Sequence, residues 1–157
     1  MNGKPWAVSI ALLLAAGCGG GEVEQTAAER AEALRAARAD STARAETAYD
    51  AAAFDTISWP DDGALWERGG VVWSFSCQKC HGADGKGGGE VAAAHSIAVS
   101  DLTKPDWPWA GDIPGIRHQI FVGHDSEMPN WGLVGLSYRD VDAAAHYIDE
   151  LLRPTTR

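Results

Sequence analysis

The sequence predicts an all-α fold, and three observations support this prediction. Apolar residues recur at helical spacing in three segments of the C-terminal two thirds of the chain. Residues that cap helix N-termini precede the first and the last of these segments. Gly and Pro are frequent across residues 82–110, which is typical of loops. The chain has 157 residues, enough for about one domain and an additional segment.

The first predicted helix is capped by Asp61 or Asp62 and runs to about Ser76. The residues that face inward on this helix are Leu65, Gly69, Val72 and Trp73. The second predicted helix carries a set of apolar residues at helical spacing, namely Ile113, Ile116, Ile120 and Phe121.

The third predicted helix opens at residues 137–140, where the sequence Ser-Tyr-Arg-Asp resembles a capping box. One apolar stripe follows, made of Val141, Ala144, Ala145, Ile148 and Leu152. Tyr147 is expected beside the crossing of the first and third helices. Arg153 and Pro154 are expected to end the third helix.

Composition excludes several classes of protein. Hydrophobic residues make up 45% of the chain, so most of it can build a core. Asp and Glu outnumber Lys and Arg by 22 to 13, and the net charge of -9 argues against nucleic-acid binding, which needs a basic face. No apolar run reaches the ~20 residues that span a bilayer. Three cysteines are too few for a disulfide-rich scaffold.

The N-terminal segment has the pattern of a secretory signal. A basic start precedes an apolar run over residues 6–16, and Gly17-Cys18 follows directly. This end resembles a bacterial lipobox, which implies that residues 1–17 are a lipoprotein signal peptide and that Cys18 becomes the lipidated first residue. Acyl chains would then anchor the protein to the outer or inner membrane, on the periplasmic side. The alternative is an ordinary cleaved signal that releases a soluble protein.

Residues 18–55 are predicted to form a tether between this anchor and the remaining chain. Three Gly residues make a flexible joint, and the segment after them is rich in Ala, Glu and Arg, which are good helix formers. Leu34 is alone as a large apolar residue in the middle of this segment, so a helix there has no apolar stripe with which to dock. The prediction is a solvated, partly helical spacer, and the alternative is a helix that binds a partner.

Residues 77–81 read Cys-Gln-Lys-Cys-His, a spacing that is typical of covalent haem attachment. Two thiols three residues apart on a turn can both reach the vinyl groups on one edge of a porphyrin and form thioethers. The next residue then lies beneath the ring and can give its imidazole to the iron. The sequence therefore predicts one covalent haem c, attached through Cys77 and Cys80 and ligated by His81.

Three other interpretations of this motif compete with haem attachment. A zinc site needs four ligands, and the chain has no second pair of cysteines. A thioredoxin-like redox pair needs a βαβ context. Chance is the third interpretation, but Cys18 for lipid and two cysteines for haem leave no cysteine unassigned. The export signal also fits, because bacteria attach haem c outside the cytoplasm.

Met128 is predicted as the second axial ligand, because an electron-transfer haem is usually six-coordinate. The other methionine, Met1, leaves with the signal. Pro129 disfavours helix at Met128 and stiffens a segment that could hold a weak thioether ligand. The alternatives are a methionine that fills a gap in the core and a histidine ligand from His95, His118 or His124, of which His124 is expected to be exposed. Three tryptophans are expected to pack as walls: Trp107, Trp109 and Trp131.

At these residues the chain resembles the class I cytochromes c, over residues 60–153. Gly69 and Trp73 stand where the family's N-terminal helix crosses its C-terminal helix. The Gly-rich turn after the haem motif and the Met-Pro-x-Trp sequence at residues 128–131 are similar to bacterial cytochrome c domains that serve oxidases and related respiratory complexes. The resemblance implies a class I cytochrome c fold, with three to four helices packed around one covalently attached haem.

The sequence thus predicts an electron-transfer protein rather than an enzyme, with a cytochrome c domain at residues 56–157 on a membrane tether. It would carry single electrons between extracytoplasmic respiratory or photosynthetic partners, such as a terminal oxidase or a quinol-oxidising complex. This domain holds 8 basic and 14 acidic side chains, a net charge of -6 that suits a partner with a basic docking patch. The alternatives are a peroxidase or gas sensor with an open sixth site, and a fixed cytochrome subunit of a respiratory complex.

Overall fold

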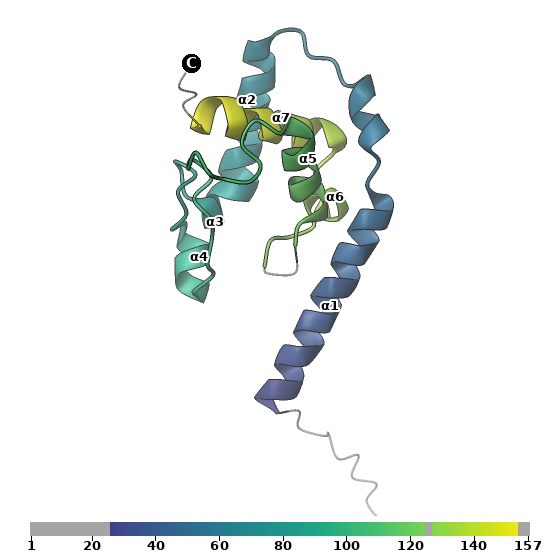
Figure 1. The fold of residues 1–157 in the computed structure, drawn as a ribbon, viewed down its shortest axis with the longest axis vertical. Helices are drawn as coiled ribbons and strands as arrows, with labels where there is room; N and C mark the ends of the chain where they lie inside the picture. Colours follow the sequence, from purple (N-terminus) through teal and green to yellow (C-terminus); the bar gives the residue numbers. More distant parts are fainter. Residues whose placement is uncertain (1–25, 125–126, 154–157) are drawn as a thin grey trace, which may run out of the picture.

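The computed structural model describes residues 26–124 and 127–153, and all the regular secondary structure in these ranges is helical (Figure 1). The prediction of an all-α fold is confirmed. The predicted signal peptide at residues 1–17 and the predicted lipidation site at Cys18 lie outside the described residues. Among the described helices, none combines the length and the apolar character needed to cross a membrane.

A continuous helical path leads to the Cys-x-x-Cys-His motif. It consists of α2 (Asp62–Val72), the π-helical turn η2 (Trp73–Cys77) and α3 (Gln78–His81). Asp61 caps α2, because its carboxylate accepts a hydrogen bond of 2.8 Å from the backbone N–H of Ala64. The predicted end near Ser76 is too early: the path continues to His81, and Gly82 ends it with a φ of 75°.

The second half of the core is α7 (Tyr138–His146), which continues as the π-helical η3 (Tyr147–Leu152) and crosses α2 (Figure 1). Ser137 caps α7 in the predicted capping box. A β-carbon on Gly69 would lie 2.4 Å from the carbonyl oxygen of Ala143. The two helices therefore touch backbone to backbone, as the resemblance to class I cytochromes c implies for Gly69.

Helix α5 (Ile113–Val122) packs against α7, and the short α6 (Trp131–Val134) packs against α5. Asp112 caps α5 by accepting a hydrogen bond of 3.0 Å from the backbone N–H of Gly115. The apolar stripes predicted for the three helices meet in one core, which contains Val72, Trp73, Ile116, Ile120, Phe121, Val141, Ala144, Ala145 and Ile148. This core holds the helical path that carries the motif.

The prediction that residues 82–110 form only loops is wrong at one place, where α4 (Glu90–His95) forms. Gly89 is its N-cap, and the residues after Glu90 include three consecutive alanines, which favour helix strongly. Ser96 ends the helix in a left-handed conformation with a φ of 54°. The surrounding Gly and Pro residues mask this short helical signal in the sequence.

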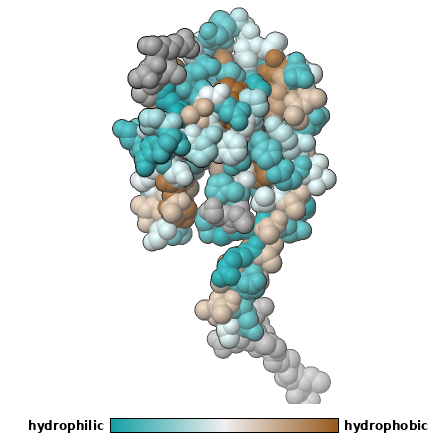
Figure 2. All heavy atoms as spheres, in the orientation of Figure 1, coloured by the Kyte–Doolittle hydropathy of each residue, from teal (hydrophilic) through white to brown (hydrophobic). Residues whose placement is uncertain are grey.

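Helix α1 (Ala27–Ala48) is capped by Thr26 and leads into the 3₁₀ helix η1 (Ala51–Thr56). Its first turns project from the body, Leu34 is 60% exposed, and the face seen in Figure 2 has no continuous hydrophobic stripe. Its last turns pack against the body, where Ala45 is completely buried. This packing differs from the solvated spacer predicted up to residue 55, because a small alanine lets the helix approach without a large apolar stripe.

Candidate functional site

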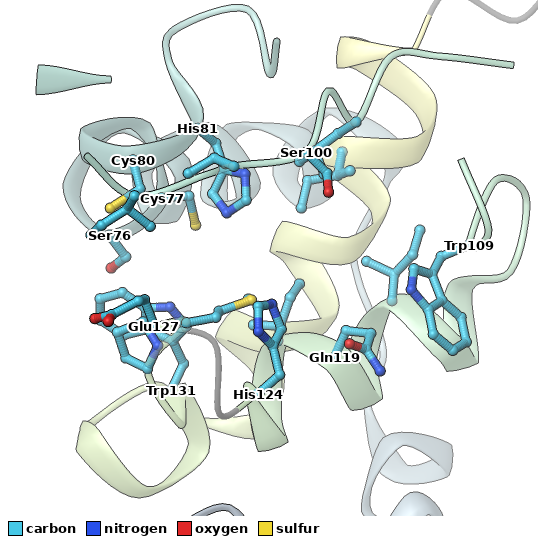
Figure 3. Close-up of a pocket in the computed structure, with 18 of the residues that line it drawn as sticks. Ser76, Cys77, Cys80, His81, Ser100, Trp109, Gln119, His124, Glu127 and Trp131 are labelled. Atoms are coloured by element: carbon cyan, nitrogen blue, oxygen red, sulfur yellow. The ribbon is translucent and has the colours of Figure 1, made fainter. Parts of the chain in front are cut away.

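A cavity lies between the end of α3, α5 and the chain segments around them (Figure 3). It holds about 980 Å³ of empty space, part of which is open to solvent. The lining is mainly apolar and includes all four residues predicted to hold haem: Cys77, Cys80, His81 and Met128. The fold thus brings together residues that are far apart in the sequence.

Cys77 and Cys80 lie on one wall of the cavity together with His81 (Figure 3). They are three residues apart on a helical path, so their side chains share one face. Both are free thiols; Cys77 is buried and Cys80 is half-buried. Burial raises the pKa of the Cys77 thiol to about 12, and the neighbouring Cys80 adds to this rise. The wall therefore offers two protein thiols side by side.

The imidazole of His81 points into the cavity (Figure 3). Its Nδ1 atom is buried and finds no hydrogen-bond partner among the described residues. Burial lowers the pKa of His81, and the positive charge that His124 can carry lowers it further. The neutral imidazole, which is the form that binds metals, is therefore favoured at this position.

The Gly-rich turn after the motif holds these residues in place. The backbone N–H of Gly87 donates a hydrogen bond of 2.8 Å to the carbonyl of His81, and that of Gly89 donates one of 3.1 Å to Cys80. A β-carbon on Gly89 would lie 2.4 Å from the carbonyl oxygen of Lys79. The turn can pack this closely on the motif only because the side chain is absent there.

The opposite wall is formed by the chain after α5. Figure 3 shows three of its side chains facing the motif, those of His124, Glu127 and Trp131. Met128 belongs to the same wall and is half-buried. A β-carbon on Gly123 would lie 2.6 Å from the carbonyl oxygen of Met128. The end of α5 therefore packs directly against the backbone that carries the predicted thioether ligand.

Among the three rival histidines, the described residues that line the cavity include only His124. The Nε2 atom of His118 instead contacts a carboxylate oxygen of Glu46 at 2.9 Å. The prediction that His124 is exposed is confirmed, yet it also borders the cavity. The sequence signal for this position is that His124 lies just after α5 and precedes Met128 by only four residues.

Four tryptophans line the cavity: Trp73, Trp107, Trp109 and Trp131. The prediction that the last three pack as walls is confirmed. For the helix-crossing residue Trp73 the sequence predicts only that it faces inward, and the structure places it at the cavity as well. Its indole Nε1 atom is buried and has no hydrogen-bond partner among the described residues.

The chemistry of this cavity fits a covalently bound iron porphyrin. It offers two thiols, a thioether and a buried imidazole whose Nδ1 atom has no hydrogen-bond partner among the described residues, all within mainly apolar walls. In the part of the chain that the structure describes, no group of three or more His, Cys, Asp or Glu side chains is arranged to hold a metal ion by itself. The residues present therefore match haem c better than a bare metal ion.

Comparison with known proteins agrees with this fit. The family described as "Cytochrome C oxidase, cbb3-type, subunit III" matches residues 64–148, more than half of the chain. The chain is 30% identical over 92 residues to the cbb3-type cytochrome c oxidase subunit FixP of Azorhizobium caulinodans. It is 32% identical over 98 residues to the cbb3-type cytochrome c oxidase subunit CcoP of Rhodobacter capsulatus.

Each of these alignments covers 59% of this chain but only 29% and 31% of the two relatives, so the chain spans less than a third of their length. No solved structure matches the chain significantly. The family match and the all-helical architecture lead to one conclusion. The chain belongs to the cbb3-type cytochrome c oxidase subunit III family of cytochromes, and its fold is that of a class I cytochrome c domain.

Proposed function

We propose that this protein transfers single electrons through one haem c held in the cavity described above. The observation that carries the proposal is the convergence of two thiols, one imidazole and one thioether on a mainly apolar pocket. Bound there, haem c would supply an iron that alternates between the ferric and ferrous states. The residues around the pocket bind and orient a cofactor, and none of them is needed to break a bond in a substrate.

Each predicted site residue has a distinct role in this proposal. Cys77 and Cys80 would hold the cofactor covalently, and His81 would bind its iron from the motif side. The low pKa of His81 keeps its imidazole neutral, as a metal ligand must be. Met128 would bind from the opposite wall, because a thioether ligand is typical of electron-transfer haem and raises its potential. The hydrogen bonds from Gly87 and Gly89 would keep the motif fixed when the iron changes charge.

Covalent attachment is tested by expressing the full chain in a host able to mature c-type cytochromes. Haem should remain with the wild-type polypeptide after extraction with acidified organic solvent. The same treatment should extract the haem from a Cys77→Ser/Cys80→Ser variant. Wild-type protein that emerges colourless, with both thiols free to alkylate, would overturn the proposal.

The sixth ligand is tested by comparing Met128→Ala with His124→Ala, because both side chains border the cavity. Ferric wild-type protein should show the weak far-red band of methionine ligation. Met128→Ala should lose this band, and His124→Ala should keep it. A low-spin wild-type spectrum without this band, which becomes high-spin in His124→Ala, would assign the ligand to His124. A high-spin wild-type spectrum would instead indicate an open site, as expected for a peroxidase or gas sensor.

We also propose that the protein is anchored to a bacterial membrane through Cys18, on the periplasmic side. The signal-like pattern at residues 1–17 supports this proposal. The 22 residues of α1 would span about 33 Å as a helix, so its exposed first turns can hold the site away from a membrane. Mass spectrometry of the mature protein should find an acylated Cys18, and Cys18→Ala should move the protein into the soluble fraction.

The proposed electron acceptor is a terminal oxidase, because both relatives are named as subunits of cbb3-type cytochrome c oxidase. The same names favour a second candidate, a fixed cytochrome subunit of such a complex. A mobile carrier with a net charge of -6 on residues 56–157 should reduce its partner more slowly as salt rises. A fixed subunit should instead co-purify with the oxidase in mild detergent and transfer electrons at a rate independent of salt.

A further inference from the structure

One face of α1 is turned toward the body of the domain. Its residues are less exposed than their neighbours on the helix, and they are Arg38, Ser41, Thr42, Ala45 and Tyr49. They follow one another at intervals of one, three or four residues, which places them along a single side of the helix. This face is polar or small rather than apolar, and it lies outside residues 64–148, which match the family.

The C-terminal end of this helix is anchored on α5 and α7. The ring of Tyr49 makes an edge contact with Phe121, with 5.4 Å between ring centres. The hydroxyl of Tyr138 donates a hydrogen bond of 3.1 Å to the carbonyl of Ala48 and accepts one of 2.9 Å from the backbone N–H of Asp50. These contacts fix the direction of α1 and so fix where its earlier turns lie.

The middle turns of α1, which carry Arg38 and Thr42, contact residues 127–130. We call these four residues the Met128 segment. Both terminal nitrogens of the Arg38 guanidinium contact the two carboxylate oxygens of Glu127, and the longer contact is 2.6 Å. The amide of Asn130 donates to the hydroxyl of Thr42 at 3.4 Å and also to the carbonyl of Val122. Helix α1 therefore holds the Met128 segment at both of its ends.

The backbone conformation of Glu127 shows why these contacts from α1 matter. Its φ is 96°, which is unfavourable for a residue with a side chain and persists only where the surroundings impose it. The ion pair with Arg38 acts on this residue, directly before Met128. A second cavity, with about 300 Å³ of empty space, lies between α1 and the Met128 segment, and Met128 lines this cavity as well as the main one. The helix thus covers the back of the proposed ligand.

We infer that Arg38 and Thr42 are positioning residues that hold Met128 toward the iron, so that α1 is a part of the cofactor site as well as a spacer. This inference rests on the proposed function, because it requires Met128 to be the sixth ligand. The two charged side chains are 38% and 39% exposed, so solvent weakens their attraction. We therefore expect Arg38→Ala to weaken Met128 ligation about two- to fivefold.

The experiment uses the full-length ferric holoprotein and measures how strongly free imidazole displaces Met128, together with the intensity of the far-red methionine band. Arg38→Ala should bind imidazole about two- to fivefold more tightly than wild type. Arg44→Ala is the matched control, because Arg44 pairs with Asp40 on the same helix at 3.2 Å and both side chains are exposed. The control should bind imidazole like wild type. Arg38→Glu/Glu127→Arg should return the affinity toward the wild-type value.

Equal imidazole affinity in Arg38→Ala and Arg44→Ala would overturn the inference. An increase in imidazole affinity in Arg38→Ala that Arg38→Glu/Glu127→Arg fails to reverse would also overturn it. So would an increase in affinity that a fall in the free energy of unfolding in urea fully accounts for. Failure of the proposed function has a different signature, because wild-type protein would then lack the methionine band before any substitution is made.

Discussion

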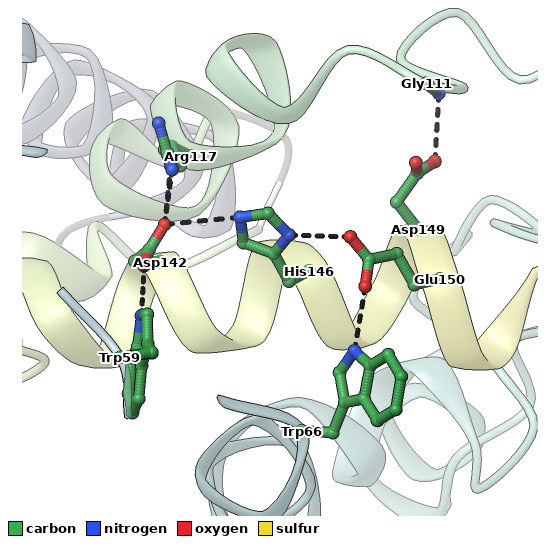
Figure 4. Close-up of polar contacts among 8 residues, drawn as sticks. All are labelled: Trp59, Trp66, Gly111, Arg117, Asp142, His146, Asp149 and Glu150. Carbon is green, nitrogen blue, oxygen red and sulfur yellow. Dashed lines mark hydrogen bonds and ion pairs between the residues drawn. The ribbon is translucent and has the colours of Figure 1, made fainter. Parts of the chain in front are cut away.

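Arg117 on α5 donates two hydrogen bonds, of 2.8 and 2.5 Å, to one carboxylate oxygen of Asp142 on α7 (Figure 4). The second oxygen accepts a hydrogen bond of 2.7 Å from the indole N–H of Trp59. One turn further along α7, His146 lies 3.6 Å from the same carboxylate and 2.8 Å from Glu150. A buried charge therefore joins the helix that lines the cavity to the helix at the centre of the core.

Arg117→Met should strongly destabilise the protein, because the carboxylate of Asp142 is only 3% exposed and would lose its cationic partner. We expect the free energy of unfolding to fall by about 2–4 kcal/mol in urea denaturation of the holoprotein. Arg44→Met, which breaks an exposed ion pair, should cost less than about 0.5 kcal/mol. Similar losses in the two variants would contradict this account. Arg117→Met/Asp142→Leu should recover part of the loss, since no charge then stays buried alone.

Gly69→Ala should separate the two crossing helices, because the new β-carbon would lie 2.4 Å from the carbonyl oxygen of Ala143. Two backbones cannot move apart without disturbing the core, so we expect a loss of about 3 kcal/mol or more in thermal or urea unfolding. Gly70→Ala is the matched control, because the nearest atom to its β-carbon would belong to the side-chain ring of Tyr147, at 3.3 Å, and not to the backbone of another helix. The control should stay within about 1 kcal/mol of wild type, since alanine favours the helix. A tolerated Gly69→Ala would show that the two helix backbones do not touch at the crossing.

Asp140 should make the protein sensitive to acid. Burial pushes its pKa upward, but hydrogen bonds from Ser137 and from the Arg68 guanidinium outweigh burial, so its pKa lies below the ordinary value. The folded pKa is thus below the unfolded value of about 3.9. The stabilisation is complete above that value and is lost as pH falls through the folded pKa.

Asp140→Asn should therefore reduce stability at pH 7 by about 1 kcal/mol and flatten the decline of the unfolding free energy below about pH 4. The measurement is urea unfolding across a pH series. Asp106→Asn, at an exposed position in a loop, should leave both the value at pH 7 and the acid slope as in wild type. An unchanged acid slope in Asp140→Asn would refute this prediction.

Gly123→Ala should displace the proposed iron ligand. Gly123 has a φ of 66°, and its β-carbon would lie 2.5 and 2.6 Å from the carbonyl oxygens of Pro129 and Met128. We expect the methionine band of the ferric protein to weaken or disappear. Gly135→Ala is the control, because it also imposes a side chain on a positive φ but meets nothing within 4 Å. Gly135→Ala should lose stability and keep the methionine band. Loss of the band in both variants would contradict the explanation that Gly123→Ala acts through a clash with the backbone of Met128.

The parts of the fold that the sequence predicts well are those that neighbouring residues determine. Ser137 and Asp61 indicate helix starts, because their side chains can accept a hydrogen bond from the backbone N–H three residues later. The structure has both caps. The Cys-x-x-Cys-His motif is equally local, because a single helical turn places its two thiols on one face. Spacing along the chain was enough to find that wall of the cavity.

The features that the sequence pattern missed depend on contacts between distant segments. Arg38 and Thr42 look like ordinary solvated helix residues until the fold places Glu127 and Asn130 opposite them. His124 lies at the cavity because α5 ends just before it, and in the sequence only its spacing of four residues from Met128 indicates this position. Polar docking of this kind leaves no hydrophobic periodicity, and hydrophobic periodicity is the signal on which sequence prediction mainly depends.

The burial of Cys77 also bears on how the protein is made. Only 7% of this residue is exposed, and a buried, protonated thiol reacts poorly. We therefore expect thioether formation to precede the final collapse of the polypeptide, which makes cofactor attachment a step of biogenesis rather than a later loading of a finished scaffold. Haem supplied to apoprotein before refolding should become covalently bound, and haem supplied afterwards should remain extractable.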